Sequence, residues 1–155
     1  MQAQIGSHLK WIEAYSMNTT DWSFQVDRRG DTGAWVREAA MSGIVSLTLA
    51  ANEKGLVPEV VVARMMTKLA QQSMEKIDRT RGHAAKSFAT ILSQSDPEPV
   101  PAIPNHKEVM HLFPFLQKKN GGIESFGWTV ESETFPVFTK LLKFPAYRER
   151  VLLGM

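Results

Sequence analysis

The sequence predicts a mainly α-helical fold, a compact helical domain built around two long central helices with at most a small two-stranded β element. Apolar residues recur at three- and four-residue spacing through most of the chain, whereas strict alternation is confined to two short stretches. The 155 residues are 43% hydrophobic, which is enough apolar material for one folded core. Because the chain has no cysteine, it forms no disulfide, and we expect a cytoplasmic protein.

The first 30 residues predict one helix and one strand. Ile5, Leu9, Ile12 and Tyr15 recur at helical spacing, and the polar residues that follow end this helix. The segment 22–26 alternates apolar and polar residues, and so does the segment 126–130. These two segments are the predicted strands of the small β element.

The two long helices are predicted over residues 34–54 and 58–93. Apolar residues occupy nearly every angular position of the first helix, so we expect protein on both of its flanks. Gly55 ends this helix, and Pro58 opens the next one. The second helix is predicted as one rod with a single apolar stripe; the alternative is two helices hinged at 81–82, where a glycine interrupts the pattern.

The chain divides into a helical core over 1–94, a proline-rich linker or arm over 95–105 and a C-terminal helical segment over 106–155. Four prolines in the arm favour extended backbone. In the C-terminal segment, Pro136 and Pro145 interrupt the apolar pattern, which predicts short helices at an angle. The segment is short for a core of its own, so we predict that it packs on the same domain.

A basic face is predicted on the second long helix. Residues 58–94 contain six basic and three acidic side chains. Steps of three and four residues place a set of polar and basic side chains on one side of an unbroken helix. Such a face could contact a nucleic-acid backbone, or it could be the solvated side of an ordinary amphipathic helix. The basic face consists of Lys68, Gln72, Lys76, Arg79, His83 and Lys86.

Catalytic, metal-binding and membrane functions find little support in the sequence. His106, Glu108 and His111 are the local group with metal-capable side chains, but His106 and His111 are five residues apart and point differently on a helix. We therefore predict no catalytic residue, no metal and no cofactor, leaving an enzyme centred on these histidines or on Asp27 as a weaker alternative. The longest apolar stretch, 44–51, is far shorter than a membrane-spanning helix.

Aromatic residues near the start of the chain are candidate interface anchors. Large rigid rings dominate the binding energy of protein interfaces. Trp11 and Tyr15 share a face of the first predicted helix, while Trp22 and Phe24 lie on the first predicted strand.

We interpret the chain as a non-enzymatic helical assembly subunit of a larger complex. Its expected partner is another protein or a second copy of itself, with nucleic acid as a further partner bound through the basic face. One alternative is a DNA-binding transcriptional regulator with a degenerate helix-turn-helix over 48–66. Another alternative is a viral or phage structural protein.

Overall fold

The computed structural model describes residues 26–27, 30–117 and 122–155, and most of these residues are helical, as predicted. Three short 3-10 helices join the α-helices in the C-terminal half: η2 (Pro114–Gln117), η3 (Gly122–Ser125) and η4 (Thr139–Lys143). The α-helices are α2 (Thr32–Asn52), α3 (Glu59–Gln72), α4 (Asp78–Leu92), α5 (His106–Met110), α6 (Glu131–Phe138) and α7 (Pro145–Gly154).

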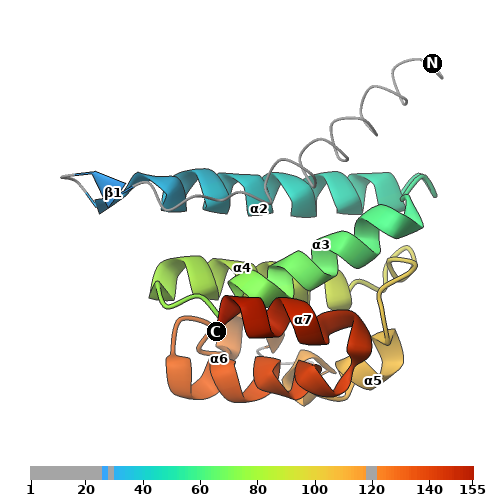
Figure 1. Cartoon of the computed structure of the whole chain (residues 1–155). Helices are drawn as coiled ribbons and strands as arrows, with labels where there is room; N and C mark the ends of the chain where they lie inside the picture. Colours follow the sequence, from blue (N-terminus) through green and yellow to red (C-terminus); the bar gives the residue numbers. More distant parts are fainter. Residues whose placement is uncertain (1–25, 28–29, 118–121) are drawn as a thin grey trace.

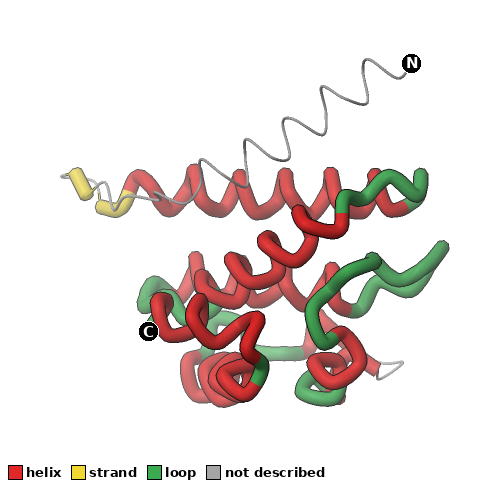
Figure 2. Tube along the Cα trace, turned by 45° about the vertical axis from the view of Figure 1, so that its right-hand side comes forward, coloured by secondary structure: helices red, strands yellow, loops and turns green. Residues whose placement is uncertain are grey.

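The helices form layers, with α2 along one side of the protein (Figure 1). The helices α3 and α4 lie beneath α2, and α5, α6 and α7 lie on the far side of that pair, an arrangement that a second view repeats (Figure 2). Contacts agree with this order, because α4 packs against α2 as well as α6, and α3 packs against α7. The middle layer therefore joins α2 to the C-terminal half.

The core is centred on Phe88 of α4. Its ring lies 5.7 Å from Phe113, 5.3 Å from Phe138 and 6.0 Å from Tyr147, measured between ring centroids. The Tyr147 hydroxyl donates a hydrogen bond of 3.0 Å to the Pro104 carbonyl, and burial raises the pKa of this phenol above its usual value. Residues of four separate segments thus share one aromatic cluster.

The turn between α2 and α3 follows the sequence prediction closely. Gly55 has a φ of 62°, in the left-handed region that glycine adopts at low cost, and its N–H donates to the Asn52 carbonyl. Pro58 caps α3, and its carbonyl accepts hydrogen bonds from the N–H groups of Val61 and Val62. The helix α2 ends two residues earlier than expected.

The predicted rod over 58–93 is wrong, because α3 ends at Gln72 and α4 begins at Asp78. The alternative hinge at 81–82 is wrong as well, since both residues lie inside α4. At the actual break the Ser73 hydroxyl donates 2.7 Å to the Leu69 carbonyl. The Ser73 side chain thus hydrogen-bonds to the last full turn of α3, at the point where the helix ends.

Arg81 stabilises this break from within α4. Its Nη1 donates to the carbonyls of Glu75 and Lys76, at 2.9 and 3.2 Å, which the end of α3 leaves without helical partners. Its Nη2 donates 2.7 Å to the carbonyl of Thr129, in the connection that leads to α6. The fully buried guanidinium therefore joins the α3–α4 break to the C-terminal half.

Gly82 allows close contact at the same place. A Cβ atom at Gly82 would lie 2.6 Å from the Thr129 methyl and 3.2 Å from the Trp128 carbonyl carbon. Gly82 is thus needed because the backbone of α4 lies close to the segment 128–129, and it does not bend the helix.

The predicted β element has a different partner from the one expected. Val26–Asp27 (β1) pairs with Gly30–Asp31 (β2) in a two-residue antiparallel ladder. The segment 126–130 is a turn, and Val130 is the N-cap of α6. Its apolar side chains pack in an aromatic cluster, with the rings of Phe126 and Phe115 stacked at 4.2 Å, so the alternation reflects burial without a strand.

The segment 95–105 lies against the helices. Val100 and Ile103 are buried in the core. The Asn52 side chain donates a hydrogen bond of 2.8 Å to the Glu98 carbonyl, which connects the end of α2 to this segment.

Candidate functional site

The structure separates the residues of the predicted basic face. Lys68 and Gln72 belong to α3, and Lys76 lies in the break between helices. The other three members lie on α4. Because the helix is interrupted after Gln72, the spacing that aligned these six residues does not place them on one surface.

Several members of the basic face have partners within the protein. Arg79 Nη2 lies 2.6 Å from Glu38 Oε2 of α2, and His83 Nε2 shares a hydrogen bond of 3.0 Å with the Ser42 hydroxyl. Lys86 Nζ lies 2.8 Å from Glu124. These contacts direct the α4 side chains toward α2 and η3 rather than toward a polyanion.

The remaining candidates lie in different surroundings. Lys68 lies on α3, which packs against α7, and burial and the nearby charge of Arg150 lower its pKa. In the region of the proposed helix-turn-helix over 48–66, the second helix is α3, which packs against both α4 and α7. The predicted anchors Trp11, Tyr15, Trp22 and Phe24 lie outside the described residues.

The described residues contain neither a metal-binding group nor a membrane-spanning helix. No three histidine or acidic side chains of that part of the chain come together as a metal group. His106 Nε2 instead makes a hydrogen bond of 2.9 Å with the Leu92 carbonyl. In the same residues, no helix is both long and apolar enough to cross a membrane.

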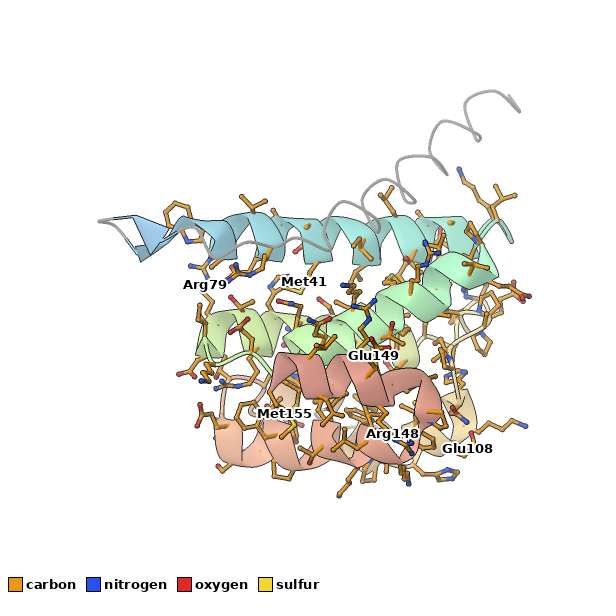
Figure 3. All side chains as sticks on the ribbon, in the orientation of Figure 1. Met41, Arg79, Glu108, Arg148, Glu149 and Met155 are labelled. Atoms are coloured by element: carbon orange, nitrogen blue, oxygen red, sulfur yellow. The ribbon has the colours of Figure 1, made fainter. Side chains whose placement is uncertain are left out.

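The helix α2 turns its polar side chains inward. Arg37 and Glu38, the charged residues of Thr32–Asn52, are only 3% and 8% exposed, and Thr48 and Asn52 are buried as well. Met41 is the fully buried apolar side chain on this side. Figure 3 shows Met41 pointing from α2 into the protein and Arg79 rising from α4 to meet α2.

The opposite side of α2 is exposed and uncharged. Trp35 is 68% exposed, Val36 69% and Leu47 40%. At about 100° per residue, these three side chains fall within about a third of the helix circumference, together with a set of small residues. We call this surface the outer face of α2; it consists of Trp35, Val36, Ala39, Gly43, Ser46, Leu47 and Ala50.

The outer face of α2 is the candidate functional site. A contiguous exposed apolar surface is typical of a protein-binding site, and aromatic residues such as Trp35 are strong interface anchors. Sequence reasoning missed Trp35, Val36 and Leu47, although the apolar character of α2 all round its axis was a signal that protein covers both flanks. The described residues cover one flank and leave the other open.

Comparison with known proteins shows the family of the chain. Residues 63–155 match the family of the tubulin folding cofactor D C terminal. The chain belongs to this family. The match begins inside α3 and includes all later helices, so α2 lies before the matched residues.

Two curated proteins resemble the chain. The tubulin-specific chaperone D of Dictyostelium discoideum is 28% identical over 165 aligned residues, covering 95% of this chain and 11% of that protein. The tubulin-folding cofactor D of Schizosaccharomyces pombe is 32% identical over 69 residues, covering 44% of this chain and 6% of that protein. The chain thus spans about a tenth or less of these cofactor D proteins. No solved structure matches it significantly.

Membership of the cofactor D family corrects the function inferred from sequence. The nucleic-acid-contacting assembly subunit, the DNA-binding regulator and the viral or phage structural protein are all wrong. The basic face was the main support for the first of these. Its residues are divided between α3, the break and α4, and Arg79 and Lys86 pair with acidic side chains of the same protein.

Proposed function

We propose that this chain is a non-enzymatic protein-binding module that takes part in tubulin folding by contacting tubulin. The observation that carries the proposal is the match of residues 63–155 to the C-terminal family of tubulin folding cofactor D. The two relatives are named for a role in tubulin folding, and one of them aligns with nearly the whole chain. A cytoplasmic location, expected from the cysteine-free sequence, belongs to the same proposal.

The outer face of α2 supports this function as the contact surface. A folding factor must recognise protein surface that is apolar and incompletely packed, and an uncharged helix face binds such surface without burying an unpaired charge. Trp35 and Val36 offer large side chains, and the small residues beside them let a partner approach closely. The proposed partner surface is therefore apolar, rather than an acidic segment.

The test measures binding of purified tubulin to the chain by isothermal calorimetry. We expect the double variant Val36→Glu, Leu47→Glu to weaken binding at least tenfold, because each change places a charge in an apolar contact. Both side chains are exposed, so the fold is expected to survive, which circular dichroism would verify.

The matched control is the double variant Val60→Glu, Leu153→Glu. Both of these side chains are also exposed and apolar, at 66% and 61%, but they lie on α3 and α7. Tubulin binding should be unchanged in this control. Failure of the unmodified chain to bind tubulin would contradict the proposed function, and equal binding by both double variants would remove α2 as the contact surface.

A further inference from the structure

We propose that two copies of this chain associate through the outer face of α2, with the two helices antiparallel and closest to each other at Gly43. The contact is symmetric, because each copy presents the same surface to the other. The dimer stands on the geometry and residue pattern of α2. Its consequence for tubulin rests on the proposed function; the dimer itself does not.

The first argument is the polarity of α2. Its charged residues Arg37 and Glu38 face the body of the protein, while Trp35 and Val36 are exposed. In Figure 1 the other described helices lie on one side of α2. A helix with water on its free side ordinarily has the reverse arrangement, so this polarity is typical of a helix that protein covers on both sides.

The second argument is charge. In a symmetric contact, a residue near the twofold axis meets its own equivalent from the other copy. A charge at such a position is therefore opposed by an identical charge, and burial in the contact leaves both unpaired. The outer face contains no Asp, Glu, Lys or Arg, so its association with a second copy meets no such repulsion.

The third argument is the fit between large and small side chains. With Gly43 on the twofold axis, residues at equal distances on either side of it lie level with each other. Val36 and Ala50 are both seven residues from Gly43, and Ala39 and Leu47 are both four residues away. Each of these large side chains therefore lies level with a small one of the other copy, which permits close packing. A parallel contact in register would instead oppose two valines and two leucines.

Gly43 is suited to the point of closest approach. It lies near the middle of α2 and of the outer face, whose ends are Trp35 and Ala50. Glycine weakens a helix interior, and a Cβ built at Gly43 meets no described atom within 4 Å, so packing of the described residues does not require a glycine there. A second helix that approaches closely gives this glycine a reason.

The size of the contact predicts a weak dimer. The outer face follows a helix about 30 Å long and about 10 Å wide, so the two copies together bury less than the about 1,200 Å² at which standard stable interfaces begin. Even interfaces of about 1,600 Å² range from micromolar to picomolar affinity. We therefore expect a reversible dimer with a dissociation constant in the micromolar range or weaker.

The dimer would compete with tubulin for one surface. While two chains are paired, Trp35 and Leu47 of both copies are buried, so tubulin binds only after the pair dissociates. The apparent affinity for tubulin is then reduced by the fraction of chains that are paired. A weak dimer thus shields the apolar face when the chain is concentrated and frees it on dilution.

The test uses single cysteines, since the chain has none of its own. Gly43→Cys places two thiols at the twofold axis, within the about 7 Å between Cα atoms that a disulfide can span. We expect a mild oxidant to link this variant into a dimer at least tenfold faster than the control Val60→Cys, whose position on α3 is also exposed. An equal mixture of Val36→Cys and Ala50→Cys should link to each other at a similarly raised rate.

The Val36→Cys variant by itself reports the direction of the helices. In the antiparallel contact, the two copies of residue 36 lie twice seven residues apart along the axis, about 21 Å, which a disulfide cannot span. This variant alone should therefore link no faster than Val60→Cys. Linking of Val36→Cys to itself as fast as to Ala50→Cys would show a parallel contact and overturn the antiparallel one.

Sedimentation equilibrium of the unmodified chain, without tubulin, measures the association directly. We expect the average mass to rise toward that of a dimer between about 1 μM and about 1 mM protein. The variant Val36→Glu, Leu47→Glu should stay monomeric, and the control Val60→Glu, Leu153→Glu should associate like the unmodified chain.

Three results would overturn the dimer. They are a monomer throughout this concentration range, Gly43→Cys linking no faster than Val60→Cys, and equal loss of association in both double variants. Because both measurements omit tubulin, their outcomes are independent of the calorimetric test of the proposed function.

Discussion

Arg81 shows how a single residue can determine where helices end. Its guanidinium is fully buried and reaches two carbonyls at the α3–α4 break and one carbonyl before α6. The Phe135 ring lies 4.9 Å from its Cζ, which adds a cation–π contact. Asp78 and Glu131 supply the countercharge, although both carboxylates are largely exposed. Arg81 therefore stabilises the fold mainly through its hydrogen bonds to backbone carbonyls.

Replacing Arg81→Met should lower the free energy of unfolding by about 3 kcal/mol or more. The change keeps an apolar stem but leaves three carbonyls without their donor in a buried region. Urea denaturation would measure the loss. The stability of Arg81→Lys should lie between those of the unmodified chain and Arg81→Met, because a lysine keeps the charge but cannot reach the carbonyls of both the α3–α4 break and Thr129. A loss below about 1 kcal/mol for Arg81→Met would contradict this role.

Gly82→Ala should destabilise the protein by about 1–2 kcal/mol, despite the better helix propensity of alanine. The added methyl would meet the Thr129 methyl at 2.6 Å, and overpacking typically costs about 1–3 kcal/mol. Chemical denaturation would show whether the free energy of unfolding falls, as expected, or rises. Adding Thr129→Ser should recover part of the loss, whereas simple additivity of the two changes would argue against a direct clash.

At the scale of elements, α2 is attached to the body of the protein by polar contacts as well as by apolar side chains such as Ile44 and Leu49. Glu38 pairs with Arg79, Ser42 with His83, and Thr48 donates to the Met65 sulfur at 3.3 Å. Met41 is the α2 side chain that is fully buried in the core cluster. An interface of this composition depends on the ionisation state of its groups.

The attachment of α2 should weaken in mild acid. Burial lowers the pKa of His83 below its ordinary value of 6.5; Glu38 opposes this shift, and Arg79 and Lys86 add to it. The unfolded chain therefore binds the proton more readily, so the stabilisation is complete above pH 6.5 and is lost as the pH falls below it.

The measurement is urea denaturation at several pH values on either side of 6.5. His83→Gln keeps a polar side chain beside Ser42 but does not titrate, so its free energy of unfolding should depend less on pH in this window. Identical pH profiles for the two proteins would show that His83 does not control the contact.

Some element boundaries could be predicted from the sequence and others could not. Gly55 and Pro58 act locally, and both were predicted in their roles. The break at 73–77 could not be predicted, because the donor that stabilises it is Arg81 of the next helix and the carbonyl that positions Arg81 belongs to Thr129, 48 residues later. Alternation over 126–130 likewise predicted a strand, whereas it reflects the packing of Phe126 against Trp128 in a turn.

For the whole molecule, residues 63–155 match the C-terminal family of tubulin folding cofactor D, and α2 packs on this part of the fold. The longer relatives contain about ten times as much chain. Under the proposed function, the outer face of α2 is the uncharged surface that contacts other protein. The calorimetric measurement of tubulin binding tests whether this face of α2 is a contact surface.

The sequence by itself determined the mainly helical class, the turn at Gly55 and the short helices of the C-terminal segment, since these depend on spacing and on residues that act within a turn or two. Tertiary structure decided where the second long helix divides, which basic side chains are paired and which flank of α2 stays open. These features depend on contacts between residues far apart in the chain, such as Arg81 with Thr129 and Arg79 with Glu38, which periodicity along one segment does not encode.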